Sequence, residues 1–223
     1  YTACPFYGSP RITAQLKRQG WIVNHKRIER VMRDMELEAL FPKANGSVHH
    51  PHHPVYPYLL RNVVTACPNH VWGTDITYIR AHHHWLYLVA ILDWYSRYVL
   101  SWRISDLMTA EVCAEALTEA LGVAQPEIHN SDQGSQFTSE AYTSILKGKD
   151  IAISMDGRGR CFDNIFTERL WRTVKYEEVY LQRYNSLVEA EASLRRYFQL
   201  YNTVRLHSSL NYKTPAEIYF GGA

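Results

Sequence analysis

The sequence lacks the features that mark membrane proteins and disulfide-rich proteins. No run approaches the roughly 18 consecutive apolar residues of a membrane-spanning helix, and the first residues do not resemble a signal peptide. The four cysteines, Cys4, Cys67, Cys113 and Cys161, form no Cys-x-x-Cys pair and no dense framework, which favours a reducing compartment. These absences predict a soluble, cytoplasmic protein with no membrane partner.

Excess charge of one sign is also absent. The net charge is only +2 over 223 residues, so any binding of nucleic acid must depend on local basic patches rather than on bulk charge. The length allows one sizeable core with a small appendage. A start at Tyr1 instead of Met is expected of a fragment, or of the tail of a longer product.

Two acidic residues occupy places where carboxylates are unusual. Asp75 lies inside WGTDITYI, a run of β-branched and aromatic residues that predicts a strand, where Asp is disfavoured without a reason. Asp132 ends a second predicted strand, PEIHNSD, and Glu168 follows 36 positions later. Three carboxylates share a site only if a cation neutralises them, and oxygen-only ligands suit Mg²⁺.

Glu168 belongs to a predicted amphipathic helix over 163–180. With about 100° per residue and Glu168 at zero, Arg172 falls near ~40° and Lys175 near ~340°. The apolar residues fall on the other side, between roughly 200° and 300°, and are Leu170, Trp171 and Val174. Asp163 or Asn164 is the expected N-cap. A solvated helix with a Glu–Arg pair would also explain this pattern, but the carboxylates upstream favour a chemical role.

Five strings in the chain resemble, in order and in spacing, the catalytic protein of the IS-three family of bacterial insertion-sequence transposases. They are WGTDITYI, LDWYSRYVLSW, HNSDQGSQFTS, SMDGRGRCFDNIFTERLWRTVKYEEVY and NTVRLHSSLNYKTPAEIY. The resemblance runs from about residue 6 to about residue 220. The 35 residues between Asp132 and Glu168 are also the spacing of the retroviral integrases.

The resemblance implies a DDE-type transposase that cleaves DNA at the ends of an insertion sequence and joins it to a target, in DNA integration and recombination. Asp75, Asp132 and Glu168 would be the catalytic and metal-binding residues. They would hold two Mg²⁺ ions, for which Mn²⁺ would substitute, with Asp75 bridging both. Arg172 and Lys175 would grip the backbone of the element end.

The same resemblance implies partners and a location. The partners would be double-stranded DNA at the element ends and target, further copies of the chain in a homo-oligomer on DNA, and an upstream-frame partner or fusion. The location would be the bacterial cytoplasm, in association with the nucleoid. Two other functions stay open: a truncated, inactive relative that only binds DNA, and a ribonuclease H that cleaves RNA in hybrids.

The order of predicted elements is βββαβαβα, which is that of the RNase H-like fold of the integrase catalytic core. This fold is a mixed five-stranded sheet with helices on both faces, and its first and fourth strands are neighbours. Asp75 would then lie beside Asp132. Asp93, in a predicted turn over 93–96, is a rival carboxylate that hydrogen bonding to its own backbone explains. The loop DGRGRCFD is a candidate lid that orders on DNA.

The first part of the chain predicts a small helical unit. Residues 10–19 and 25–37 are expected helices around a turn at Gly20, with Asn24 capping the second. Four side chains of the second helix would face inward: Ile28, Val31, Met32 and Met35. Four would face outward: Lys26, Arg27, Arg30 and Arg33. This is a helix-turn-helix pattern, and the resemblance favours DNA binding over a plain helical hairpin.

We therefore expect four segments, which are a helix-turn-helix domain over 1–42, a linker over 43–68, a catalytic core over 69–182 and a C-terminal helical extension over 183–223. Zinc binding by the His-rich linker is disfavoured, because Cys67 is the only cysteine near its four histidines, His49, His50, His52 and His53. In the extension, Arg205 and His207 would either touch DNA or brace the fold.

Overall fold

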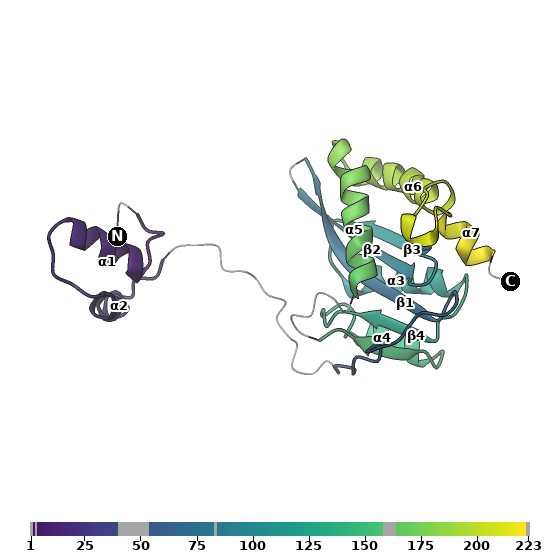
Figure 1. Ribbon diagram of the computed structural model, residues 1–223, viewed down its shortest axis with the longest axis horizontal. Helices are drawn as coiled ribbons and strands as arrows, with labels where there is room; N and C mark the ends of the chain where they lie inside the picture. Colours follow the sequence, from purple (N-terminus) through teal and green to yellow (C-terminus); the bar gives the residue numbers. More distant parts are fainter. Residues whose placement is uncertain (1, 3, 40–53, 83, 158–163, 222–223) are drawn as a thin grey trace. The chain divides into compact units, whose positions relative to one another are not determined.

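The computed structural model describes residues 2, 4–39, 54–82, 84–157 and 164–221. The chain divides into two compact units, Tyr1–Gly46 and Ser47–Ala223, each of which is considered by itself (Figure 1). None of the helices within these described ranges is long and apolar enough to cross a membrane.

The first unit is built on two short helices, α1 (Ser9–Arg18) and α2 (His25–Asp34). Gly20 adopts a φ of 89° in the turn between them, a conformation that glycine adopts without strain. The predicted cap at Asn24 is confirmed, since its Oδ1 accepts a hydrogen bond from the backbone N–H of Arg27 at 2.9 Å.

The predicted inward face of α2 is only half right. Ile28 and Met32 are buried, but Val31 is 39% exposed and Met35 is 62% exposed. The helix ends at Asp34, before the predicted residue 37, and two residues later Glu36 takes a left-handed φ of 53°. The contact with α1 therefore covers a single i,i+4 pair rather than a four-residue face.

The second unit contains the predicted five-stranded mixed sheet. Its strands are β1 (Val71–Ala81), β2 (His84–Asp93), β3 (Val99–Ser105), β4 (Ile128–Ser131) and β5 (Ala152–Met155). They lie in the order β3-β2-β1-β4-β5, with β1–β2 and β2–β3 antiparallel and β1–β4 and β4–β5 parallel. The RNase H-like architecture expected from the sequence is confirmed.

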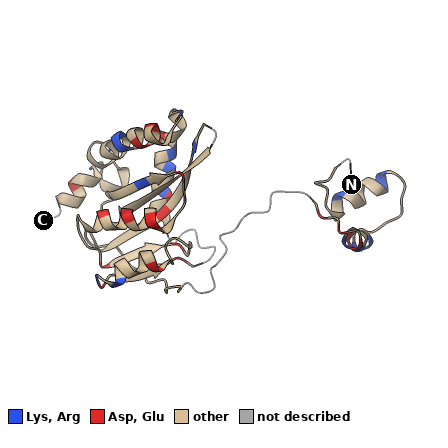
Figure 2. Cartoon of the chain, turned by 180° about the vertical axis from the view of Figure 1, so that it is seen from behind, with Lys and Arg blue, Asp and Glu red and all other residues tan. Residues whose placement is uncertain are grey.

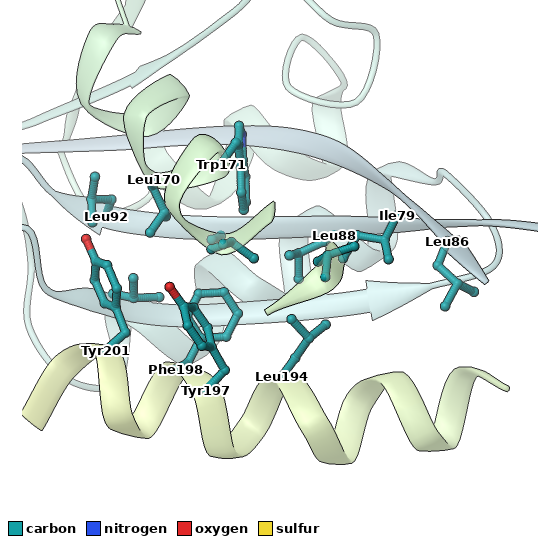
Figure 3. Close-up of a cluster of buried hydrophobic side chains, with 14 of the residues drawn as sticks. Ile79, Leu86, Leu88, Leu92, Leu170, Trp171, Leu194, Tyr197, Phe198 and Tyr201 are labelled. Carbon is teal, nitrogen blue, oxygen red and sulfur yellow. The ribbon is translucent and has the colours of Figure 1, made fainter. Parts of the chain in front are cut away.

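Helices cover both faces of this sheet. One face packs against α3 (Ala110–Leu121) and α4 (Glu140–Lys147), and the other against α5 (Ile165–Glu177) and α6 (Leu187–Thr203). Figure 3 shows the second core, where apolar side chains of α5 and α6 meet those of the sheet. The buried stripe predicted for α5, which consists of Leu170, Trp171 and Val174, is confirmed.

Part of the segment that the sequence predicts as linker packs against this unit. Leu60 is 5% exposed within the α5–α6 core. The backbone N–H of Leu59 donates to Ser154 Oγ at 3.1 Å, and the backbone N–H of Met155 donates to the carbonyl of Pro57 at 3.4 Å. The four linker histidines lie outside the described residues, as does most of the loop DGRGRCFD.

The end of the chain closes over the outer strand β3. A short 3-10 helix, η2 (Val179–Leu181), joins α5 to α6, and a second one, η3 (Ser208–Leu210), joins α6 to α7 (Pro215–Phe220). Helix α7 starts with a capping box between Thr214 and Glu217. Asn202, buried near the end of α6, accepts from the backbone N–H of Val99 at 3.0 Å. Its Nδ2 donates to the carbonyl of the same residue at 2.9 Å, so one side chain pairs with the backbone of the sheet edge.

Replacing this amide tests whether it holds α6 to the sheet. We expect Asn202→Ala to lower the free energy of unfolding by about 2–3 kcal/mol, because it leaves two buried backbone groups without partners. Urea unfolding followed by circular dichroism measures the loss. The exposed neighbour gives the control, since Thr203→Ala should stay within about 0.5 kcal/mol of the wild type. Equal effects of the two substitutions would contradict this role.

Candidate active site

The register between β1 and β4 brings two carboxylates together. Val71 to Gly73 pair in parallel with Ile128 to Asn130. Continuing this register by two residues places Asp132 opposite Asp75, and neighbouring strands lie about 4.8 Å apart. The two side chains belong to the face that α5 covers, so the predicted neighbours meet at the end of β4.

Few neighbouring groups stabilise the negative charge of Asp75. Burial, together with the nearby charge of Asp132, raises the pKa of Asp75 to about 7. Two hydrogen bonds oppose this shift: Oδ1 accepts from the backbone N–H of Ile76 at 2.8 Å, and Oδ2 accepts from Trp171 Nε1 at 3.0 Å. In the part of the chain that is described, neither aspartate forms a salt bridge with Lys or Arg.

Asp132 begins the turn after β4. Its Oδ1 accepts from the backbone N–H of Gly134 at 2.8 Å, which fixes the carboxylate against its own loop. The side chain keeps a solvent-accessible side, yet its surroundings are dense enough that desolvation raises the pKa of Asp132 above the usual range. Both aspartates therefore favour a bound cation over a solvated carboxylate pair.

Helix α5 reaches this edge because β1 has no side chain at Gly73. A Cβ there would clash with Trp94 Nε1 and would lie 2.8 Å from Thr167 Oγ1. Asn164, at the start of the helix, donates from Nδ2 to the carbonyl of Thr74 at 3.2 Å and accepts from Thr167 at 2.6 Å. Asn164 thus joins the helix to the strand, where the sequence suggested a helix cap.

Glu168 follows Thr167 on this helix and is exposed. Its position on the helix is about 60° from Trp171, the residue that touches Asp75. No three His, Cys, Asp or Glu side chains within the described ranges approach closely enough to hold a metal ion. The structure thus brings Asp75 and Asp132 together and places Glu168 on the adjoining helix, without bringing all three into one cluster.

A further carboxylate, which the sequence reasoning missed, belongs to the same row. Ser131 pairs with Met155, so the register places Asp156 opposite Asp132, and the backbone N–H of Asp156 donates to the carbonyl of Ser131 at 2.9 Å. Its Oδ1 accepts from Asn130 Nδ2 at 2.8 Å. The available signal was its place directly after the third parallel strand, since the carboxyl ends of parallel strands share one edge.

Three other residues considered from the sequence have structural partners. Asp93 accepts at its two carboxylate oxygens from Asn69 N, Ser96 N and Ser96 Oγ at 2.6–2.8 Å, which explains this carboxylate as expected. Arg205 forms two hydrogen bonds with Glu177 at 2.6 and 2.7 Å. His207 packs edge-on against Tyr201, and burial lowers its pKa to about 4. For these last two residues the geometry favours bracing.

The cations proposed to bind DNA are placed at the surface. Arg172 is exposed and Lys175 is partly exposed, both on the side of α5 that does not enter the core. In the first unit Lys26, Arg27 and Arg30 are exposed on α2. Figure 2 shows both signs of charge spread over the two units, and α3 carries an acidic outer face of Glu111, Glu115 and Glu119.

The donor set at this edge fits a divalent cation of the hard class. Asp75 and Asp132 offer oxygen atoms only, the charge of Asp132 raises the pKa of Asp75, and neither has a cationic partner in the described structure. Mg²⁺ and Mn²⁺ are the ions that carboxylate oxygens select. Glu168 is the nearest predicted residue that would complete such a site from α5.

Comparison with known proteins shows which protein families the chain matches. Residues 65–161 and 149–215 match the family described as integrase core domain, and residues 3–45 match the family described as HTH-like domain. The chain is 33% identical to the insertion element IS600 uncharacterized 31 kDa protein of Shigella sonnei, covering 94% of this chain and 80% of the relative.

Two transposases are similarly related. The transposase for insertion sequence element IS904 of Lactococcus lactis is 32% identical over 95% of this chain and 86% of its own length. Transposase InsF for insertion sequence IS3A of Escherichia coli is 33% identical over 91% of this chain and 73% of its own.

Two solved structures share the fold. The HTLV-2 integrase catalytic core domain in complex with magnesium has a TM-score of 0.55 and 19% identity, covering 69% of this chain and 97% of that one. The simian T-cell lymphotropic virus intasome, in complex with the PP2A regulatory subunit B56 gamma, gives a TM-score of 0.61 and 17% identity over 92% of this chain and 69% of that one.

The raised pKa of Asp75 leads to a test by pH. Between about pH 4 and 7 the folded chain keeps a proton on Asp75 that the unfolded chain has released, so this residue makes the fold less stable as pH rises. We expect Asp75→Asn to stabilise the metal-free protein at pH 8 by on the order of 1–2 kcal/mol, or about 3–6 °C in melting temperature, and to have no such effect near pH 4.

The same melts with Mg²⁺ complete the test. Wild-type protein should gain more stability from Mg²⁺ at pH 8 than at pH 6, and Asp75→Asn should lose most of that gain. Asp106→Asn removes an exposed carboxylate elsewhere and serves as the control. A gain from Mg²⁺ that is equal in Asp75→Asn and wild type would place the cation at another site.

Proposed function

Because this chain belongs to the IS3 family of insertion-sequence transposases, we propose that it cleaves DNA at the ends of an insertion sequence and joins the free end to target DNA. The observation that carries this proposal is the register that sets Asp75 and Asp132 side by side, with Glu168 on helix α5, whose Trp171 contacts Asp75. The reaction is a phosphoryl transfer that depends on a divalent metal.

In this mechanism Asp75, Asp132 and Glu168 would hold Mg²⁺. The bound metal would supply activation of water or of a 3′-hydroxyl and stabilisation of the leaving oxygen. The chain's own residues orient the site: Trp171 holds one oxygen of Asp75, and the Gly134 backbone holds one oxygen of Asp132. Asp156, fixed by Asn130, adds negative charge that favours cation binding at this edge.

Binding of DNA is assigned to two surfaces. Arg172 and Lys175 lie within about 40° of Glu168 on α5, where a strand that reaches the carboxylates would pass. The opposite face of the sheet is disfavoured, because α3 exposes three glutamates there. In the first unit the exposed cations Lys26, Arg27 and Arg30 would contact phosphates or a groove.

We assign the helix-turn-helix domain to residues 1–42, the linker to 43–68, the catalytic core to 69–182 and its helical extension to 183–223. Residues 54–60 belong functionally with the core, because Leu59 and Leu60 are bound to it. We further propose that the chain acts as a homo-oligomer on DNA, since two element ends must be joined in one event. An upstream-frame partner would supply additional end recognition.

The two rival functions are less well supported. A chain that only binds DNA would not need two neighbouring aspartates without a cationic partner among the described residues, and Asp75 and Asp132 are both present. A ribonuclease H would not need an N-terminal helix-turn-helix unit. Incubation with DNA carrying the element's ends, in the presence of Mg²⁺ or Mn²⁺, separates both from the proposed activity.

The carboxylates give the most direct prediction. Asp75→Asn, Asp132→Asn and Glu168→Gln should each reduce cleavage and strand transfer by about a thousandfold or more, since each removes a ligand that acts in the transition state. Gel assays on labelled element ends measure both steps. Glu140→Gln, an exposed carboxylate on α4, is the matched control. Retained activity in any of the three variants would remove that residue from the site.

The cations of α5 give a second prediction. Arg172→Ala or Lys175→Ala should weaken binding to any duplex and flatten its salt dependence by about one counterion per lost phosphate contact. Stability should change little, because both side chains lie outside the core. Lys149→Ala, an exposed lysine near β5, should keep the wild-type slope. Unchanged slopes in both variants would leave this helix face merely solvated.

A third prediction concerns the first unit. Replacing Lys26, Arg27 and Arg30 together by Gln should reduce both affinity and the preference for element ends over unrelated duplex, because all three are exposed on one helix. Removal of residues 1–46, with Pro54 to Leu60 kept, should leave metal-dependent but poorly selective strand transfer. If affinity and preference both stay the same, the first unit is an assembly module.

A further inference from the structure

A cavity lies on the side of α5 that faces away from the aspartates. It has a volume of about 500 Å³ and is bounded by α5, the end of α6 and the segment 205–212. The α5 residues that line it include Phe166, Arg169 and Thr173, which lie roughly 100–160° around the helix from Glu168. We call it the arginine cavity, because Arg97, Arg169 and Arg205 line it.

The lining of the arginine cavity contains cations and hydroxyl groups but no carboxylate. Ser208, Ser209 and Tyr212 supply hydroxyl groups beside the three arginines. Such a lining is electropositive and rich in hydrogen-bond donors, which is the composition of an oxyanion site.

Two nitrogen atoms of the lining are buried without a hydrogen-bond partner in the described structure. They are Nη1 of Arg97 and Nε2 of His207. Both atoms have almost no accessible surface, so they lie behind the wall of the cavity, where the guanidinium of Arg97 adds positive charge to its surroundings. Burial and the charges of Arg205 and Arg97 lower the pKa of His207 to about 4, so the ring is neutral near pH 7 and the arginines are the cations of the cavity.

Arg97 is held in a fixed position beside the arginine cavity. Its backbone adopts a left-handed φ of 64°, and its guanidinium lies 3.5 Å from the centre of the Phe166 ring. Asp93, the acidic residue nearest in sequence, already accepts three hydrogen bonds from Asn69 and Ser96. Arg97 forms no salt bridge with the described residues, so its positive charge acts on the cavity.

The other two arginines of the cavity, Arg205 and Arg169, differ in their partners. Arg205 is paired with Glu177, so its charge is compensated and it shapes the wall. Arg169 is exposed at the rim, and no salt bridge joins it to the described residues. Together with Arg172, it extends a basic arc around α5 from the proposed active site to the cavity.

We propose that the arginine cavity binds a phosphate group, at a site separate from the metal-binding carboxylates. Arg169 donates from the rim, the hydroxyl groups of Ser208 and Ser209 complete the shell, and Arg97 adds positive charge behind the wall. The phosphate comes either from the backbone of bound DNA, an assignment that depends on the proposed function, or from a free phosphate compound.

The first experiment uses inorganic phosphate and needs no DNA or catalysis. Melting temperatures of the full chain are measured in phosphate and in chloride at equal ionic strength, with Mg²⁺ absent. We expect a phosphate-specific rise that grows with concentration. Arg169→Gln should weaken the apparent affinity for phosphate by about tenfold, and Ser209→Asp should abolish the rise, since it introduces a negative charge.

Two controls locate the site. Arg172→Gln changes the next cation of the same helix, and Arg61→Gln changes an exposed arginine outside the cavity. Both should bind phosphate like the wild type. No difference between phosphate and chloride in the wild type, or equal loss in Arg172→Gln and Arg169→Gln, would overturn the proposal.

The second experiment identifies the source of the phosphate. If DNA supplies it, Arg169→Gln and Ser209→Asp should lower the salt dependence of duplex binding by about one counterion, while Arg61→Gln leaves it unchanged. A loss of phosphate binding with an unaltered DNA slope would support the site and assign it to a free phosphate compound. Phosphate binding that persists in a protein inactive on element ends would separate this proposal from the transposase function.

Discussion

The parallel pairing of β1, β4 and β5 is the constraint on which the site depends. Each of the three strands places an aspartate on the same face, so Asp75, Asp132 and Asp156 follow one another across the sheet at the spacing of its ladder. Their repulsion is tolerated because burial raises the pKa of Asp75 to about 7 and because backbone and amide donors hold the oxygens of all three. The same repulsion makes the edge selective for a small, highly charged cation.

Much of this was accessible from the sequence. The alternation of helical and strand patterns predicted the sheet and its flanking helices, and Asp75 stood out because an acid inside an apolar strand needs a reason. The core face of α5 followed from helical periodicity, since a long helix against a large sheet has a wide apolar stripe. The stripe of α2 was overestimated, because a ten-residue helix packed on one other helix buries only an i,i+4 pair.

Other features depend on contacts that no local pattern encodes. Asn164 has the look of a helix cap, yet its amide binds the backbone of Thr74, ninety residues earlier in the chain. Asp156 looks like a loop residue until the strand register is known. Part of the predicted linker packs on the core because Tyr58 and Leu60 find apolar partners there, which composition alone does not indicate. The pairing of Arg205 with Glu177 could likewise be recognised only from the folded structure.

Gly73 shows how far the demands of the chemistry spread beyond the residues that perform it. Any side chain at this position would push against Trp94 and Thr167, and so would lift α5 from β1. Glu168, Arg172 and the floor of the arginine cavity all move with that helix. In a survey of tolerated substitutions, this glycine would therefore be as intolerant as a catalytic carboxylate. Selection in the family would preserve this glycine because it sets the distance between α5 and β1.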